Sequence, residues 1–221
     1  MKTAQSFTRS FPLDRKSLLG LYSQLGLREN NIIPEADLPQ FLEKQGVPYQ
    51  EWGHRPGTKS FESLLGSLRL GECAVESNGH GIVIHWHVAV AYVYHRFKHR
   101  QNEIFEHHQK LPSGQKIQRD FPGIGEKILA KETPEEAVRR GLGEELGQTE
   151  PLFKQPDFYT LFSKEEIVTE PAPSDWFRPL RDVYHRKIFT VPEIAPVLYR
   201  PEYHEARDGR EIVFRWRVVK Q

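Results

Sequence analysis

The sequence predicts an α/β protein, specifically an α/β/α sandwich with a mixed sheet and an N-terminal helical extension. Three observations lead to this prediction. Residues 82–95 alternate between two sets of side chains, as a β-strand does. Residues 134–146 carry apolar side chains at helical spacing, and strand-like segments occur before and after them. Residues 1–78 look largely helical, so we expect them to form the extension and residues 79–221 to form the second domain.

Three helices are expected in the extension. Asp14 can cap the first helix, and Gly26 lies near its end. Residues 35–44 form the second helix, and residues 61–68 carry the apolar stripe of the third. We find no chemical motif in this part of the sequence. We therefore expect the extension to cover the core or to contact a protein partner.

The strand over residues 82–95 has two distinct faces. One face carries large apolar side chains such as Trp86, and the other carries smaller ones together with His85 and His87. The pair Asn78 and Gly79 is a hairpin-turn signal in front of this strand. No Cys/His spacing in the sequence completes a zinc site around the two histidines, so we interpret them as histidines on the sheet surface.

The remaining elements lie on either side of residues 134–146. Residues 97–120 are polar and are expected to include a short hairpin that turns at residues 112–114. Further on, residues 171–179 are interpreted as a loop. A turn signal at Asp208 and Gly209 precedes the last of three expected strands, which cover residues 158–162, 183–191 and 211–219.

The helix over residues 134–146 has clear start and stop signals. Thr133 is a favourable N-cap, Pro134 suits the first helical position, and Glu136 completes a capping box with Thr133. Gly147 fits the C-terminal stop. The apolar stripe that this helix would bury consists of Ala137, Val138, Leu142 and Leu146.

The most informative segment is residues 121–147. Its second half follows the pattern G-x5-E-x7-R-E-U-x-E-E-x-G, in which U is apolar. The residues on that register are Glu132, Arg140, Leu142, Glu144, Glu145 and Gly147. This part of the segment resembles the Nudix box. Position 141 is a glutamate in the box and is Gly141 in this chain.

The resemblance implies a metal site on one face of the helix. Positions 141, 144 and 145 share that face, and clustered carboxylates suit Mg²⁺ or Mn²⁺. By similarity to the family, Glu144 and Glu145 hold the metal and Arg140 orients the acids. Glu132 completes the anionic cluster or positions water. Glu132, Arg140 and Glu145 are therefore the candidate catalytic residues.

The first half of the segment departs from the family pattern P-G-G-x-U-E-x-G-E. Leu129 falls where one acid is expected, and Lys131 replaces a glycine. Glu126 is the candidate replacement for the lost acid and a third candidate metal ligand, because it lies on the loop that faces the start of the helix. A glycine inside a helix costs roughly 1 kcal/mol relative to alanine. Gly141 and Gly143 therefore suggest a packing reason or a close approach by another group.

Two functions remain open at this stage. The first is a weak or altered metal-dependent hydrolase of nucleoside diphosphate-linked compounds, as the resemblance implies. The second is a non-catalytic module that binds a nucleotide-like ligand or a protein, which the loss of one ligand carboxylate favours. An acid in the space beside Gly141 would support the enzyme. Lys127 or Lys131 in that space, paired with Glu145, would block metal binding.

The composition argues against several other classes. The chain has 221 residues, and 31 Lys and Arg against 30 Asp and Glu give a net charge of +1, so general nucleic-acid binding is not expected. No apolar run reaches the length of a transmembrane helix, and we expect no membrane interaction. The single cysteine, Cys73, fits a reducing compartment, for which we predict the cytoplasm. The polar N-terminus is expected to be a short lead, with an organellar targeting peptide left open.

Overall fold

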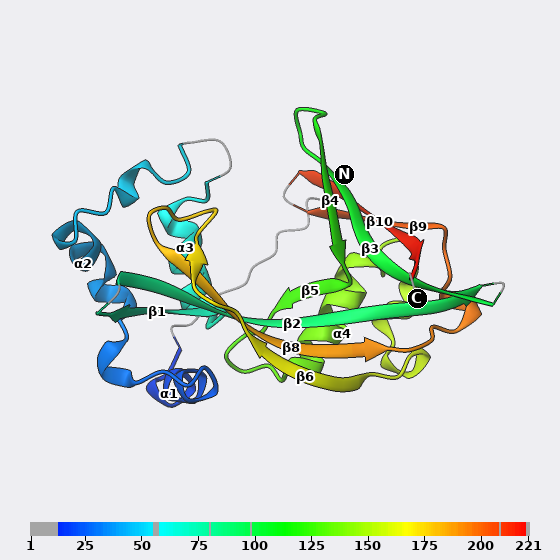
Figure 1. Ribbon diagram of the computed structural model, residues 1–221, viewed down its shortest axis with the longest axis horizontal. Coiled ribbons are helices and arrows are strands. Elements are labelled where there is room, and N and C mark those ends of the chain that lie inside the picture. Colours follow the sequence, from blue (N-terminus) through cyan, green and yellow to red (C-terminus); the bar gives the residue numbers. More distant parts are fainter. Residues whose placement is uncertain (1–12, 55–57, 80, 98, 208, 220–221) are drawn as a thin grey trace, which may run out of the picture. The chain divides into compact units, whose positions relative to one another are not determined.

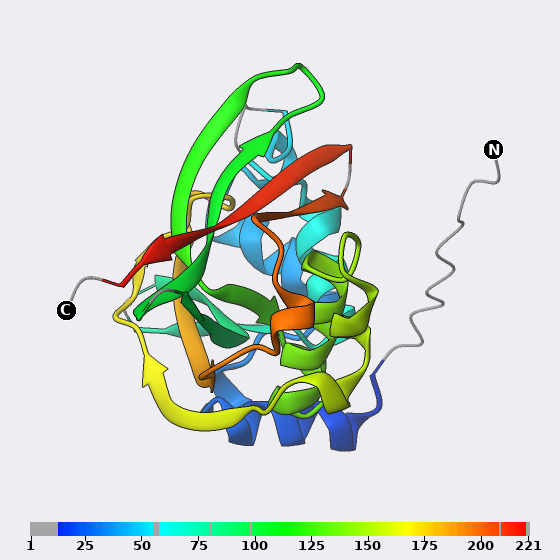
Figure 2. The ribbon, with the colours of Figure 1, turned by 90° about the vertical axis from the view of Figure 1, so that its right-hand side faces the viewer.

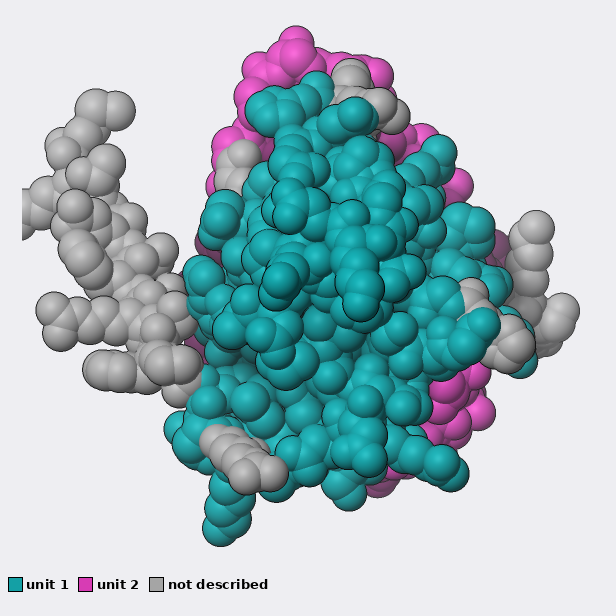
Figure 3. Space-filling view, turned by 90° about the vertical axis from the view of Figure 1, so that its left-hand side faces the viewer, with its two compact units in different colours: residues 1–87, 129–131, 169–184 teal, residues 88–128, 132–168, 185–221 magenta. Residues whose placement is uncertain are grey.

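The chain is described by a computed structural model that covers residues 13–54, 58–79, 81–97, 99–207 and 209–219. The expected N-terminal lead lies outside these residues, and so does Asp208 of the predicted turn. The chain divides into two compact units, shown in different colours in Figure 3. Unit 1 comprises residues 1–87, 129–131 and 169–184, and unit 2 comprises residues 88–128, 132–168 and 185–221. The domain boundary expected after residue 78 stays a prediction.

Unit 1 contains the three expected helices. Helix α1 (Arg15–Gln24) begins after Asp14, whose Oδ1 accepts a hydrogen bond from the backbone N–H of Ser17 at 2.9 Å. Helix α2 (Leu38–Lys44) continues from the 3₁₀ turn η2 (Glu35–Asp37), and α3 is Phe61–Leu70. Two further 3₁₀ turns are η1 (Glu29–Asn31) and η3 (Tyr49–Glu51). The capping signals read from the sequence are thus borne out for α1.

Unit 1 also contains a hairpin. Strand β1 (Cys73–Asn78) pairs antiparallel with the first part of β2 (Gly81–Phe97), and Asn78 lies opposite Gly81. The predicted hairpin is therefore confirmed, although β1 itself was not expected. A two-residue strand, β7 (Ala172–Pro173), pairs with the start of β8 (Arg181–Val191) inside the segment expected to be a loop.

The interpretation of His85 and His87 as surface residues is wrong. Their exposed fractions are 7% and 3%, because both faces of β2 are covered at this point. The imidazole Nε2 of His85 lies 3.2 Å from Oε2 of Glu76 on β1. Burial lowers the pKa of His85, and the neighbouring Glu76 carboxylate opposes that shift.

The sheet of unit 2 has the strand order β6-β8-β2-β3-β10-β9 (Figures 1 and 2). Short strands β4 and β5 pair antiparallel with β3 and β2. The hairpin that turns at residues 112–114 is confirmed, and its two strands are longer than expected. The strands not yet defined are β3 (Arg100–Lys110), β4 (Lys116–Pro122), β5 (Ile124–Lys127), β6 (Phe162–Val168), β9 (Glu202–Arg207) and β10 (Arg210–Val218).

The strand predicted over residues 158–162 is wrong. Residues Pro156–Phe158 form a 3₁₀ turn, η5, and the strand begins only at Phe162. Pro156 is the first residue of η5, a position that suits proline because it lacks a backbone N–H and has a fixed φ. Two other 3₁₀ turns, η4 (Pro151–Lys154) and η6 (Pro196–Leu198), also begin at a proline.

Helix α4 (Pro134–Glu145) packs on the sheet of unit 2 and matches its prediction closely. The Thr133 side chain accepts a hydrogen bond from the Glu136 N–H, and the Glu136 carboxylate accepts one from the Thr133 N–H, which makes the expected capping box. The predicted stripe of α4 belongs to a buried core with Ala89, Ala91 and Val93 of β2. A large sheet with several helices confirms the α/β class. In the described ranges, no helix is long and apolar enough to cross a membrane.

Candidate functional site

Glu126 occupies the space that Gly141 leaves open. Glu126 lies on β5, opposite Ala89 of β2, and is 6% exposed. A Cβ atom built on Gly141 would be 3.1 Å from Cβ of Glu126 and 3.6 Å from its Oε2. The glycine therefore provides room for an acidic side chain from a different element. This acid faces the middle of α4 rather than its start, where the sequence had suggested it.

Arg140 connects the acids of the site. Its Nε and Nη2 donate hydrogen bonds to the two carboxylate oxygens of Glu132, each at 2.9 Å, and Nη2 also donates to the Lys127 carbonyl at 2.7 Å. Its Nη1 lies 3.2 Å from Oε1 of Glu126. Burial alone would lower the pKa of Arg140, but the Glu132 hydrogen bonds and the Glu126 charge raise it well above its ordinary value. Arg140 therefore stays charged and holds Glu132 and Glu126 in place.

The two acids of the E-E pair have different surroundings. The Glu144 side chain is 48% exposed, and its Oε2 lies 3.8 Å from Nη1 of Arg140. Glu145 is 7% exposed. Partial burial and the charge of Glu126 raise the pKa of Glu144. Burial raises the pKa of Glu145 well above its ordinary value, and the neighbouring carboxylates of Glu126, Glu205 and Glu106 add to that shift.

Two further charged residues of this cluster lie on β9 and were not identified from the sequence. Glu205 is 3% exposed, and burial followed by the charges of other carboxylates raises its pKa, against the opposing effect of Arg207. The guanidinium Nη1 of Arg207 lies 3.8 Å from Oε1 of Glu205 and 3.9 Å from Oε2 of Glu126. The only signal in the sequence is the alternation along β9, which puts Glu205 on the same face as the buried Tyr203.

The donor chemistry of this cluster fits a hard divalent cation. Oε2 of Glu126 and Oε2 of Glu205 are buried and accept no hydrogen bond from the described residues. Carboxylate oxygens are the ligands that Mg²⁺ and Mn²⁺ prefer. As they stand, no three His, Cys, Asp or Glu side chains of the described residues converge on one point as a metal site. Nη1 of Arg207 lies within 4 Å of the carboxylates of Glu126 and Glu205, and its charge would oppose a cation there.

A lysine does not take the space beside Gly141. The described atoms nearest to a Cβ on Gly141 all belong to Glu126. The Lys131 ammonium lies 3.7 Å from Oδ2 of Asp14. Of the two arrangements that the sequence left open, the one with an acid beside Gly141 is therefore found.

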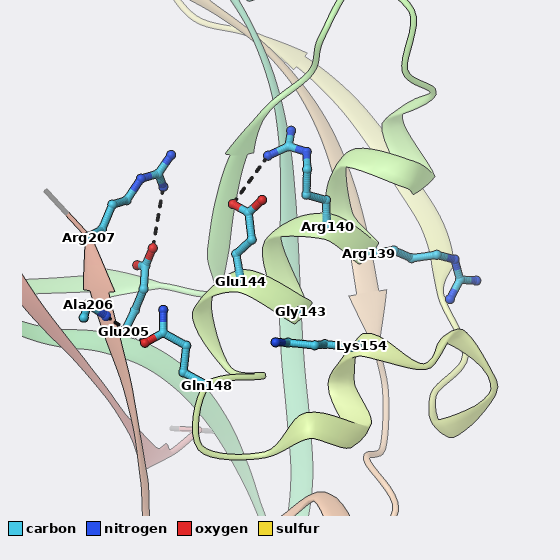
Figure 4. Close-up of a pocket in the computed structure, with 9 residues that line it drawn as sticks. All are labelled: Arg139, Arg140, Gly143, Glu144, Gln148, Lys154, Glu205, Ala206 and Arg207. Atoms are coloured by element: carbon cyan, nitrogen blue, oxygen red, sulfur yellow. Dashed lines mark hydrogen bonds and ion pairs between the residues drawn. The ribbon is translucent and has the colours of Figure 1, made fainter. Parts of the chain in front are cut away.

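A pocket of about 520 Å³ opens beside the acid cluster (Figure 4). It lies between α4, the turn η4 and strand β9, all within unit 2. Four of its lining residues are cationic and two are acidic, so both signs of charge face the same space. The lining residues are Arg139, Arg140, Gly143, Glu144, Gln148, Lys154, Glu205, Ala206 and Arg207.

Comparisons with known proteins add little to this picture. No protein-family model matches the chain, and no curated protein matches it. Among solved structures, the chain is similar to a Nudix hydrolase from M. smegmatis, RenU, with 14% sequence identity and a TM-score of 0.30. The match covers 59% of this chain and 69% of that chain. A structural likeness this distant does not indicate an activity for this chain.

Proposed function

We propose that the chain is a hydrolase that uses Mg²⁺ or Mn²⁺ to cleave nucleoside diphosphate-linked compounds. The observation that carries the proposal is the position of Glu126 against Gly141. The segment resembling the Nudix box lacks one acid, and Glu126 brings another carboxylate from β5 to within 3.6 Å of the Cβ position of residue 141. The number of acids around the helix face is thereby kept, although their order in the sequence is not.

The residues of the site have separate roles in this proposal. Glu126, Glu144 and Glu205 hold the cation, since two of them have buried oxygens without a hydrogen bond from the described residues and the third lines the pocket. The bound cation supplies charge stabilisation to the phosphoryl group and lowers the pKa of the attacking water. Arg140 is a positioning residue, because it binds Glu132 through two parallel hydrogen bonds and contacts Glu126.

Glu145 does not line the pocket. It is buried next to the other carboxylates, and its raised pKa means that it tends to hold a proton when no cation neutralises the cluster. In the proposed enzyme, Glu145 would lose that proton more readily if the neighbouring carboxylates held a cation. Metal binding would then be coupled to proton release.

The alternative function is a nucleotide-binding or protein-binding module without catalysis. One observation favours it: Arg140 and Arg207 already neutralise part of the acid cluster. If these arginines are permanent counter-ions, the cluster has a structural role. A protein partner at the N-terminal extension and a location in the cytoplasm stay predictions under either function.

The test is turnover of a panel of nucleoside diphosphate-linked compounds, with Mg²⁺ and with Mn²⁺, by the wild type and by Glu126→Gln. We expect metal-dependent turnover in the wild type and a fall of at least about a hundredfold in the variant, the size of effect seen when a group that stabilises transition-state charge is removed. Glu135→Gln, an exposed acid on the same helix, is the matched control and should keep full activity. Absence of metal-dependent turnover in the wild type would favour the binding module.

A further inference from the structure

Lys154 packs beside two glycines, Gly143 of helix α4 and Gly147 after its end. It is the last residue of η4, and Figure 4 shows its side chain running beside Gly143. A Cβ built on Gly143 would be 3.5 Å from Cγ of Lys154, and a Cβ built on Gly147 would be 3.1 Å from its Cε. A side chain larger than alanine at Gly143 would meet the lysine stem, whereas at Gly147 a side chain would first meet the carbonyl oxygen of Gly143. Gly143 therefore leaves room for the lysine stem beside the pocket.

The ammonium group of Lys154 is not used by the rest of the site. Among the described residues, it has no hydrogen-bond or ion-pair partner. The three arginines of the pocket, in contrast, are engaged. Arg140 binds Glu132, and Arg207 lies within 4 Å of Glu126 and Glu205. Arg139 donates to the Pro156 carbonyl at 3.3 Å, and its guanidinium carbon lies 5.4 Å from the centre of the Tyr159 ring.

Gln148 adds a second donor to the same pocket. Its Oε1 accepts a hydrogen bond from the Ala206 N–H at 3.0 Å, which fixes the orientation of the amide. Its NH₂ group is therefore left to donate, and Gln148 lines the pocket together with Lys154. An ammonium and an amide NH₂ that open onto one cavity are suited to the oxygens of a phosphate group.

We propose that Lys154 is a specificity-determining residue that binds a phosphate group of the ligand, with Gln148 as a second donor. The identity of that ligand as a diphosphate compound rests on the proposed function. The acids Glu126, Glu144 and Glu205 supply the cation-binding side of the site, and Lys154 supplies the anion-binding side. A ligand with a negatively charged group at this point is selected over one that is neutral there, because only the former pairs with the ammonium.

The test is binding of inorganic diphosphate to the full chain by calorimetry in metal-free buffer at low ionic strength. We expect saturable binding by the wild type and a ten- to hundredfold weaker affinity in Lys154→Gln, the range expected for one charge-assisted hydrogen bond. Lys154→Arg keeps the charge and should retain most of the affinity. Lys164→Gln, an exposed lysine on β6 outside the pocket, is the control and should bind as the wild type does.

A second measurement follows the Lys154 side chain directly. After reductive ¹³C-methylation of the lysines, the signal that is missing from Lys154→Gln should shift on addition of diphosphate. Unchanged affinity in Lys154→Gln, or no saturable binding by the wild type, would overturn the assignment. Since no metal and no turnover are involved, this result is independent of the hydrolysis assay. Failure of one proposal can therefore be told apart from failure of the other.

Discussion

Among the predicted site residues, Glu145 is buried beside several other carboxylates. Burial, followed by the charges of Glu126, Glu205 and Glu106, raises its pKa. A raised pKa in the folded state means that the folded chain binds more protons than the unfolded one. The contribution of this group to stability is therefore complete below the unfolded pKa, near 4.5, and is lost as the pH rises through the folded pKa.

Glu145→Gln should remove this pH dependence, because glutamine resembles the protonated acid and does not ionise. The free energy of unfolding of the variant, relative to the wild type, should increase as the pH rises above 4.5, by up to about 1.4 kcal/mol per pH unit. Urea denaturation at pH 5 and at pH 8 measures the difference. Glu135→Gln on the same helix serves as the control. A difference that is constant with pH would mean that Glu145 is not held in its protonated form.

Arg207 should compete with a divalent cation for the acid cluster. Removing its charge in Arg207→Gln leaves Glu126 and Glu205 without this counter-ion, so we expect Mn²⁺ to bind on the order of tenfold more tightly. Arg215→Gln is a matched control, because Arg215 is similarly exposed and pairs with Glu202 elsewhere on the sheet. Mn²⁺ titration by electron paramagnetic resonance measures the affinity. Equal affinities in the three proteins would show that Arg207 does not oppose the metal.

The sequence identified only part of this cluster. The register of one segment identifies Glu132, Arg140, Glu144 and Glu145. The expectation that Arg140 orients the acids agrees with its hydrogen bond to Glu132. Glu205 lies on a strand far along the chain, and no local pattern links it to α4. Its role depends on the sheet order that brings β9 beside the helix, which is a property of the tertiary fold.

At the scale of elements, the glycines of α4 have different neighbours and should respond differently to the same substitution. Gly143→Ala adds a Cβ at an ordinary 3.5 Å from Lys154 and should stabilise the helix by roughly 1 kcal/mol. Gly141→Ala adds a Cβ only 3.1 Å from Cβ of Glu126, which cannot move without its backbone. We expect this second variant to lose that gain and to be less stable than Gly143→Ala by about 1–2 kcal/mol.

Urea denaturation of the two alanine variants and the wild type provides this comparison. The two substitutions share the helix and the chemical change, so helix propensity cancels between them. Equal stability of Gly141→Ala and Gly143→Ala would show that Glu126 does not pack against position 141. The result would then remove the physical basis for treating Glu126 as the replacement acid.

Elements whose own sequence carries a capping or periodicity signal were predicted well. Elements that form because they pair with another part of the chain were not. Helix α4 has a capping box and an apolar stripe within its own sequence, and its start was predicted correctly. Strand β5 is only four residues long and exists because it pairs with β2, so the sequence suggested a loop there. The strand predicted over residues 158–162 was wrong, since aromatic residues such as Phe158 and Tyr159 favour strands, but Phe158 ends the turn η5 and β6 begins only at Phe162.

At the scale of the whole molecule, the candidate chemistry belongs to unit 2. The acids, both arginines of the cluster and the pocket all lie within residues 88–128, 132–168 and 185–221. Unit 1 contributes none of the nine residues that line the pocket. In the proposed enzyme, Glu126 on β5 takes the part of the acid that α4 lacks at Gly141.

Returning the acid to α4 tests this role of Glu126. Activity would be compared among the wild type, Glu126→Gly and the double variant that combines Glu126→Gly with Gly141→Glu, with circular dichroism to check folding. We expect metal-dependent hydrolysis in the wild type, its loss in the single variant and recovery in the double variant, where residue 141 supplies the carboxylate. Full activity in folded Glu126→Gly would show that the site does not need the acid on β5 and would rule out this role.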